Sequence, residues 1–362
     1  MIRILQAADL HMDSPFEGLS SEQAALRRRE QRGLLNSLVE LAEDSGAQLM
    51  LLAGDLLDSS RVYTETGTML VNALSKLSIP VFISPGNHDF YSLRSPYARL
   101  QLPANVHVFT QSRLSPVVLE ELGVRVWGAG YTDRVCPPLL ENFSPVREEE
   151  LLDILCFHGE VTGSASPYAP CTPEQLARSG ADYAALGHIH AFSGLRQAGD
   201  TYYAWPGCPE GRGFDECGEK GAILADVAHR RCKLRFVPLG GRRYEILRVA
   251  AGEDALSAVL SALPEGSERY IYRIILTGEL ERGLQLPALR DALAERFFAL
   301  QLVDETTAAR SLWEKIDENS LTGLFLRRMQ QRLAETGSDE DRRILMMALR
   351  CGLAALEGGE EP

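Results

Sequence analysis

The 362-residue chain predicts a layered α/β fold, and three observations support this class. Short apolar runs alternate with amphipathic stretches through the first 240 residues, as strands and helices do in α/β proteins. Hydrophobic residues make up 45% of the chain and charged residues 24%, which is enough apolar surface for a core and excludes intrinsic disorder. Five of the apolar runs end in Asp, Asn or His, and functional side chains of α/β folds gather at such strand ends.

The first 240 residues are expected to hold two helices and nine strands. Residues 22–44 carry Leu34, Leu38 and Val39 at helical spacing, with Gly46 just past the end, and residues 64–77 form the second helical pattern. The later strands are separated by short turns that contain glycine, which predicts a second and more antiparallel sheet. The expected strands are residues 2–8, 48–53, 80–84, 124–127, 152–157, 183–186, 202–205, 222–227 and 233–237.

Gly240 and Gly241 mark an expected domain boundary after residues 1–240. Beyond them a β-α-β-α-β pattern (244–249, 253–263, 270–277, 287–297 and 299–303) predicts a small α/β domain over residues 241–310. Residues 311–362 show only helical patterns, at 321–336 and 338–356. The first of these helices has an apolar stripe that fits either docking on the preceding domain or binding of a partner protein: Leu321, Leu324, Phe325, Met329 and Leu333.

Net charge and cysteine spacing exclude several classes of protein. The formal net charge of -13 argues against nucleic-acid binding by diffuse positive charge, but it allows local positive charge from bound metal ions. The seven cysteines form no C-x-x-C pair, the N-terminus lacks the pattern of a signal peptide, and no apolar run approaches the roughly 18–20 residues of a membrane span. We therefore expect a cytoplasmic protein with reduced thiols and no membrane segment.

Metal-binding residue types follow five of the expected strands, as Asp9-Leu10-His11, Gly54-Asp55, Gly86-Asn87-His88-Asp89, His158-Gly159 and Gly187-His188-Ile189-His190. Each motif alone has a simpler explanation, such as a polar turn, a helix cap or a loop histidine. Five of the seven histidines fall in these motifs, and the ends of parallel strands share one edge, so we expect one shared metal site. Carboxylate, amide and imidazole ligands without thiolate favour Mn²⁺, Fe²⁺ or catalytic Zn²⁺ over structural zinc. Seven ligands are too many for one ion, and two ions about 3.5–4 Å apart that share a carboxylate would use them all.

The five motifs in this order resemble the calcineurin-like metallophosphoesterase superfamily over about the first 190 residues. Two further segments, residues 8–16 and 205–221 (WPGCPEGRGFDECGEKG), resemble the SbcD-like DNA-repair exonuclease subunits, especially the YhaO type. The resemblance implies a four-layer β-sandwich flanked by helices, with a small α/β capping domain and a helical C-terminal tail. It also implies DNA as substrate and a coiled-coil SMC-like ATPase as partner, and a homodimer is a further assembly to test.

The resemblance implies a role for each residue of the motifs. His88 would stabilise or protonate the leaving oxygen while Asp89 holds its ring, and a hydroxide between the two ions would attack phosphorus. One departure is Asp58, because some similar nucleases have histidine at that position, three residues after the bridging Asp. The implied ligands are Asp9, His11, Asp55 and His190 on one ion, and Asp55, Asn87, His158 and His188 on the other.

Arginines offer candidate contacts to substrate. Residues 205–221 hold five glycines and Arg212, which fits either an irregular connection or a loop that contacts the nucleic-acid backbone, with Arg212 on a phosphate. Arg27, Arg28, Arg29 and Arg32 fit a solvated helix face better than a substrate contact.

The leading prediction for function is two-metal hydrolysis of DNA phosphodiesters by an exonuclease of DNA repair. The same centre would serve a phosphodiesterase or phosphatase for a small nucleotide-type substrate, although the additional domain and helical tail favour a large substrate or a partner. A non-catalytic scaffold is the third hypothesis, and the presence of all eight site positions disfavours it.

Overall fold

Strand β1 (Ile2–Ala7) shows how the alternation of apolar residues builds the first sheet. Ile4 packs on one face of the sheet and Leu5 on the other, because successive side chains of a strand point to opposite faces. The sheet has the order β12-β11-β1-β2-β3-β4, in which β1 to β4 are parallel, β11 is antiparallel to β1, and β12 is antiparallel to β11. The other strands are β2 (Leu49–Leu52), β3 (Val81–Ile83), β4 (Val106–Val108), β11 (Gly221–Ala228) and β12 (Arg231–Pro238).

The computed structural model describes residues 1–59, 62–252, 254–280, 283–308 and 311–356. The chain divides into two compact units, Met1–Arg243 and Tyr244–Pro362. The division expected from the sequence, 1–240, 241–310 and 311–362, stays a prediction, and its second boundary falls on residues 309–310, outside the described part of the chain.

A second six-stranded sheet completes the first unit, with the order β5-β6-β7-β8-β10-β9. Its four inner strands, β6, β7, β8 and β10, are parallel, and only the edge pairings β5·β6 and β10·β9 are antiparallel. The strands are β5 (Ser115–Leu119), β6 (Val124–Gly128), β7 (Leu152–His158), β8 (Tyr183–Gly187), β9 (Arg196–Ala198) and β10 (Thr201–Ala204).

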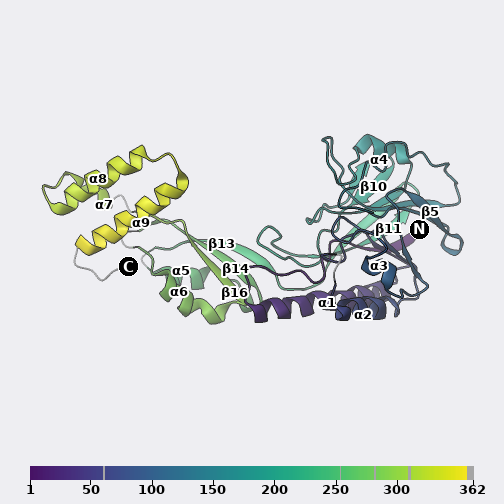
Figure 1. Cartoon of the computed structure of the whole chain (residues 1–362), viewed down its shortest axis with the longest axis horizontal. Helices are drawn as coiled ribbons and strands as arrows, with labels where there is room; N and C mark the ends of the chain where they lie inside the picture. Colours follow the sequence, from purple (N-terminus) through teal and green to yellow (C-terminus); the bar gives the residue numbers. More distant parts are fainter. Residues whose placement is uncertain (60–61, 253, 281–282, 309–310, 357–362) are drawn as a thin grey trace. The chain divides into compact units, whose positions relative to one another are not determined.

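The two sheets face each other and form a four-layer sandwich with the helices (Figure 1). Residues of both sheets, including Leu51 and Ile154, fill the core between them. Helices α1 (Ser21–Ser45) and α2 (Thr64–Leu74) cover the outer face of the first sheet, and α4 (Pro173–Ser179) covers that of the second. The α/β class and the flanking helices predicted from the sequence are confirmed.

Two details of the sequence prediction are wrong. The second sheet is mainly parallel, and residues 222–227 and 233–237 belong to the first sheet, because β11 pairs with β1 at its edge. The sequence analysis also missed β4, β5 and β9, and helices α3 (Pro96–Arg99) and α4. A signal for α4 was present, since Thr172 and Gln175 form a capping box at its start with Pro173 as the first helical residue.

The second unit contains the expected β-α-β-α-β arrangement. Strands β13 (Tyr244–Ala250), β14 (Ile271–Thr277) and β16 (Ala299–Asp304) form a parallel sheet in that order. Helices α5 (Ala255–Ala262) and α6 (Leu286–Leu293) supply Val259 and Leu293 to its core. Short strands β15 (Glu279–Leu280) and β17 (Thr307–Ala308) pair separately.

Helices α8 (Leu321–Glu335) and α9 (Asp339–Leu356) follow the short helix α7 (Ser311–Glu314) and pack on each other. The stripe predicted on α8 divides in two: Phe325 and Met329 belong to the core shared with α9 and Leu333 is buried, whereas Leu321 and Leu324 are exposed. Within the described ranges, none of the helices combines the length and the apolar composition that crossing a membrane requires.

Candidate metal centre

The predicted ligands meet where strands of both sheets end. Strands β1, β2 and β3 of the first sheet and β7 and β8 of the second lead directly into the five motifs. Contacts of 3.0–3.9 Å between ring nitrogens and carboxylate or amide oxygens, and of 3.3 Å between facing ring nitrogens, link all seven side chains. The side chains brought together are Asp9, His11, Asp55, Asn87, His158, His188 and His190.

The backbone turns sharply at these strand ends. Asp9, His11, Asp55 and His188 have φ values of 55°, 44°, 49° and 95°, a left-handed region that non-glycine residues seldom adopt. Such conformations are retained mainly at functional sites, where the surrounding structure enforces them. The turn also lets Asp9 and His11, two residues apart, present both side chains to the same point.

Two motif glycines are required by close approach. A Cβ atom on Gly54 would lie 2.5 Å from Nδ1 of His158, and one on Gly86 would lie 2.3 Å from Oδ1 of Asp55. Neither atom can retreat easily, because both side chains are buried in the centre. The glycines of Gly54-Asp55 and Gly86-Asn87 therefore make room for the predicted ligand side chains of neighbouring motifs.

One group of donor atoms comes from Asp9, His11 and His190. Nε2 of His11 lies 3.3 Å from Nε2 of His190, and Nε2 of His190 lies 3.6 Å from Oδ1 of Asp9. Asp9 and His11 are fully buried, whereas the His190 side chain is 30% exposed. The two imidazole nitrogens thus face each other across a small space that a carboxylate also borders.

The second group of donor atoms comes from Asn87, His158 and His188. The His158 ring donates from Nδ1 to the carbonyl oxygen of Ala53 (3.0 Å), so its Nε2 faces Oδ1 of Asn87 at 3.0 Å and Nδ1 of His188 at 3.3 Å. Asp55 lies between the groups, because its Oδ2 is 3.7 Å from Nε2 of His11 and 3.4 Å from Nε2 of His158.

Burial shifts the pKa values of the carboxylates and histidines in the centre. Burial raises the pKa of Asp9 to about 6 and lowers the pKa of His11 to about 4. Burial would also raise the pKa of Asp55, but the adjacent His158 outweighs it and holds that pKa well below its usual range. Burial opposes the charged form of His158 too, yet Asp55 raises its pKa to about 9. A proton is therefore favoured on Nε2 of His158, the nitrogen that faces Asn87 and His188.

These residues fit divalent metal ions. Lone pairs of facing imidazole nitrogens repel at 3.3 Å unless a proton or a cation lies between them. Two buried carboxylates at the same point also need a counter-charge. Oxygen and imidazole donors without sulfur match Mn²⁺, Fe²⁺ or catalytic Zn²⁺.

His88 and Asp89 are placed differently from each other. The His88 side chain is 44% exposed, its Nδ1 lies 3.1 Å from the carbonyl oxygen of Asp58, and its ring meets the edge of the His11 ring. Asp89 is fully buried and accepts hydrogen bonds from the backbone N–H groups of Gly86 and Leu56. The expectation that Asp89 holds the His88 ring is therefore wrong: Asp89 shapes the turn, and Asp58 contacts the ring.

The sequence analysis missed two carboxylates behind the histidines. Oε1 of Glu160 lies 2.9 Å from Nε2 of His188, and Oε1 of Glu216 lies 2.6 Å from Nδ1 of His190. Carboxylates that accept from the outer nitrogen of a ligand histidine fix its tautomer and orientation. The position of Glu160, two residues after His158, was an available signal, whereas only tertiary structure places Glu216.

Trp205 is a third residue that sequence reasoning left without a role. Its Nε1–H points at the carbonyl oxygens of Gly159 and Gly187, each 3.1 Å away. These carbonyls follow His158 and precede His188, so the indole ties two of the ligand-bearing strand ends together.

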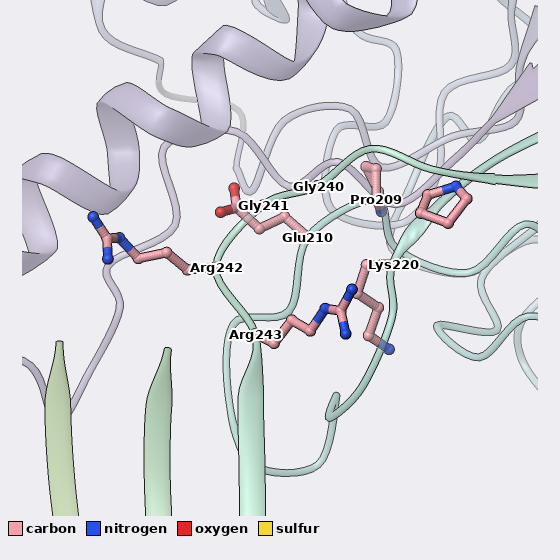
Figure 2. Close-up of a pocket in the computed structure, with 8 residues that line it drawn as sticks. Pro209, Glu210, Lys220, Gly240, Gly241, Arg242 and Arg243 are labelled. Atoms are coloured by element: carbon pink, nitrogen blue, oxygen red, sulfur yellow. The ribbon is translucent and has the colours of Figure 1, made fainter. Parts of the chain in front are cut away.

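The structure shows contacts for the arginines that the sequence suggested as substrate contacts or as a solvated helix face. Arg212 contacts the carboxylates of Asp58 and Glu216, and the structure shows its side chain 20% exposed. Arg27 and Arg32 are buried and paired, which contradicts the expected solvated face: Arg27 pairs with Glu210. Figure 2 shows Glu210 and Arg242 pointing toward helix α1, where Arg242 contacts Glu30. Residues 209–212 are thereby anchored to α1.

Nitrogen and oxygen donors gathered at the strand ends of two facing sheets make this a layered α/β protein with a candidate site for divalent metal ions. Residues 2–192 match the family described as calcineurin-like phosphoesterase, and the chain belongs to that family. It is accordingly a metallophosphoesterase, a hydrolase of phosphoesters that uses divalent metal ions.

Relatives cover different lengths of the chain. Metallophosphoesterase YhaO of Bacillus subtilis (strain 168) is 29% identical over 356 residues, which cover 89% of this chain and 84% of YhaO. The DNA double-strand break repair protein Mre11 of Saccharolobus solfataricus is 27% identical over 245 residues, or 63% of this chain and 61% of that protein. The solved structure of TT1561 of Thermus thermophilus covers 66% of this chain and 99% of its own, with 15% identity and a TM-score of 0.40.

Proposed function

We propose that this metallophosphoesterase hydrolyses phosphodiester bonds of DNA with two divalent metal ions, preferably Mn²⁺, as an exonuclease of DNA repair. The observation that carries the two-ion arrangement is the position of Asp55, whose Oδ2 lies 3.4–3.7 Å from nitrogens of both donor groups. The similarity to an Mre11 protein, named for repair of DNA double-strand breaks, supports DNA as the substrate.

The two donor groups support the proposed division of the ligands between two ions. Asp55 would be a ligand of both ions, because its carboxylate lies between the two donor groups. When bound, two divalent ions would polarise the phosphoryl oxygens and lower the pKa of water enough for a nucleophile at neutral pH. The ligands would be Asp9, His11, Asp55 and His190 for one ion and Asp55, Asn87, His158 and His188 for the other.

His88 is the proposed catalytic residue among the histidines. Its ring is the most exposed of the five at the centre, and it contacts His11 at the edge of the first donor group. A proton held at Nδ1 is donated to the carbonyl oxygen of Asp58 (3.1 Å), which orients the ring and leaves Nε2 for the substrate. In its protonated form, His88 would stabilise the leaving oxygen or give it a proton. The buried Asp89 would support the turn that carries His88.

The proposed partner is a coiled-coil SMC-like ATPase that binds the C-terminal helices. Leu321 and Leu324 on α8 and Ile344 and Met347 on α9 are 59–68% exposed, although each helix buries other apolar residues against its neighbour. Exposed apolar side chains on two packed helices fit the side of a partner helix. A homodimer through the same helices is a competing outcome.

The substrate is tested by comparing two phosphodiesters. End-labelled linear DNA and bis-p-nitrophenyl phosphate are each incubated with the protein in Mn²⁺ and in Mg²⁺. We expect both to be hydrolysed, with DNA shortened progressively from its ends. Hydrolysis of bis-p-nitrophenyl phosphate alone would favour a small nucleotide-type substrate, and loss of both reactions despite bound metal would favour a scaffold.

His88→Ala serves as the catalytic variant in this comparison, and His229→Ala as its matched control. The two histidine side chains are 44% and 43% exposed, but His229 contacts Asp182 instead of the metal centre. Cleavage that is lost in His88→Ala and retained in His229→Ala assigns the activity to the centre and excludes a contaminating nuclease.

A further inference from the structure

Arg212 joins two carboxylates that belong to different parts of the first unit. Its Nη2 donates to Oε1 of Glu216 (2.9 Å), and its Nη1 donates to Oδ1 of Asp58 (3.2 Å). The backbone N–H of Arg212 also donates to Oε2 of Glu216 (2.8 Å). The planar guanidinium therefore holds both carboxylates at fixed positions, as a lysine ammonium could not.

Each of these carboxylates contacts a different histidine of the same donor group. Oε1 of Glu216 lies 2.6 Å from Nδ1 of His190, and Oδ1 of Asp58 lies 3.2 Å from Nδ1 of His11. On the inner side of the rings, Nε2 of His11 faces Nε2 of His190 at 3.3 Å. Nδ1 of His190 also lies 3.2 Å from Nη2 of Arg212, but the shorter contact is with Glu216, a carboxylate that can only accept, so the neutral His190 ring is favoured with the proton on Nδ1 and the lone pair on Nε2. Nδ1 of His11 makes no hydrogen bond to the described residues, and the negative charge of Asp58 beside it favours the same tautomer.

Burial makes this arrangement rigid. The Glu216 side chain is 5% exposed, and those of Asp58 and Arg212 are 23% and 20% exposed. The adjacent Glu210 pairs with the fully buried Arg27 of helix α1, and the carbonyl oxygen of Gly211 accepts from the same guanidinium at 3.0 Å. The segment that carries Arg212 is consequently fixed to helix α1.

We propose that Asp58, Arg212 and Glu216 form a positioning clamp that fixes His11 and His190 for one of the two metal ions. This inference rests on the proposed function and deepens it, since it concerns the same centre. The clamp gives Arg212 a positioning role in place of a phosphate contact. It also explains why an aspartate serves at position 58, because a carboxylate there accepts from Arg212 and faces His11.

The second donor group lacks this device among the described residues. The outer nitrogen of His188, Nε2, contacts a single carboxylate, that of Glu160 (2.9 Å), which is 24% exposed, and the ring also lies against Tyr168. The chain therefore offers a pair of matched changes, Glu216→Gln behind one ion and Glu160→Gln behind the other. Glu219→Gln is a neutral control, because Glu219 lies in the same loop, is 55% exposed and pairs with Arg243.

The test measures Mn²⁺ binding to the metal-free full-length protein by calorimetry, together with kcat and KM on bis-p-nitrophenyl phosphate. We expect Glu216→Gln and Arg212→Ala each to weaken one of two binding events about 10–100-fold. Glu160→Gln should weaken the other event, and Glu219→Gln neither. Arg212→Lys should restore only part of the loss, because an ammonium cannot hold both carboxylates in the same geometry.

A double-mutant cycle examines the coupling through Arg212. Asp58→Asn combined with Glu216→Gln should lose less Mn²⁺ affinity than the two single losses together, since both act through one guanidinium. Asp58→Asn and Glu216→Gln are near-isosteric changes, so the test does not depend on Arg212→Ala alone. A thermal denaturation curve for each metal-free variant shows whether that variant is folded.

The outcomes separate this inference from the proposed function. Wild-type protein that binds no Mn²⁺ would overturn the proposed metal centre itself. If the wild type binds two ions but the clamp variants bind Mn²⁺ equally well, the positioning clamp is wrong. A rise in KM for Arg212→Ala with unchanged Mn²⁺ affinity would also overturn it and return Arg212 to a substrate contact.

Discussion

Exposure to solvent distinguishes His88 from the proposed ligands around it. His11 and His158 are fully buried, and Asp55 is 2% exposed at its side chain, whereas His88 is 44% exposed. We expect His88→Ala to keep bound metal and to lose about 10²–10⁴-fold in phosphodiester cleavage, the usual cost of a lost general acid. Asp55→Ala should lose metal instead, because it removes the shared ligand.

The distinction between His88 as a catalytic residue and Asp55 as a metal ligand is checked by measuring the metal content and the cleavage rate of both purified variants. Wild-type protein treated in parallel gives the reference metal content. A metal-free His88→Ala protein would show that His88 is a ligand, and a metal-loaded Asp55→Ala protein would show that Asp55 is not shared.

The acid stability of the metal-free protein tests Glu216. Burial alone would raise the pKa of Glu216, but hydrogen bonds from His190 and Arg212 outweigh it and hold the pKa well below its ordinary value of 4.5. A carboxylate with a depressed pKa stabilises the fold above its unfolded-state pKa, and this contribution is lost as the pH falls below that value. Such a buried pair contributes on the order of 2–3 kcal/mol.

Urea denaturation between pH 7 and pH 3 measures the effect. The free energy of unfolding of the wild type should fall more steeply below about pH 4.5 than that of Glu216→Gln, which carries no titrating carboxylate. Glu219→Gln should retain the wild-type slope. Equal slopes for all three proteins would contradict the ion-pair strength assigned to Glu216.

At the scale of secondary-structure elements, helices α8 and α9 carry both buried and exposed apolar residues. Leu326 is fully buried between the helices, whereas Leu321 and Leu324 are 68% and 59% exposed on the same helix. We expect the double change Leu321→Ser and Leu324→Ser to leave the melting temperature unchanged and to abolish co-purification with the proposed ATPase partner. The reason is that only the exposed part of the stripe is free to contact another helix.

Two comparisons complete this experiment. Leu326→Ala should lower the stability of the helix pair, because truncating a buried leucine typically costs about 2–5 kcal/mol. Truncation after about Asn319 should leave a folded protein that still cleaves a small phosphodiester. A truncated protein that aggregates, or an exposed-residue variant that melts early, would show that the stripe belongs to the protein's own core.

At the scale of the whole molecule, the proposed action on DNA requires an acidic protein to approach a polyanion. The net charge of -13 repels DNA, so local positive charge must come from bound cations and nearby arginines. We expect activity to require added divalent metal, to be higher with Mn²⁺ than with Mg²⁺, and to disappear in excess EDTA. Mg²⁺ is disfavoured because four of the seven proposed ligands are imidazoles. Full activity in excess EDTA would falsify the two-metal proposal.

The sequence by itself determined which residues could form the centre. Asp9, His11 and Asp55 follow apolar runs, and parallel strands bring such residues to one edge by topology alone. The same periodicity established helix α1, whose residues Leu35 and Leu38 pack on the first sheet. These inferences succeed because a strand end and a helix face are local properties of the chain.

Tertiary structure alone decided which groups stand behind the ligands. Asp89 looked like the partner of its neighbour His88, yet folding turns it inward to backbone N–H groups and brings Asp58 to the ring from thirty residues earlier in the chain. Glu216 contacts His190 from a loop whose Glu210 pairs with Arg27 of helix α1, and β11 joins β1 across more than two hundred residues. Such contacts depend on side-chain geometry and burial between distant segments, which hydrophobic periodicity does not encode.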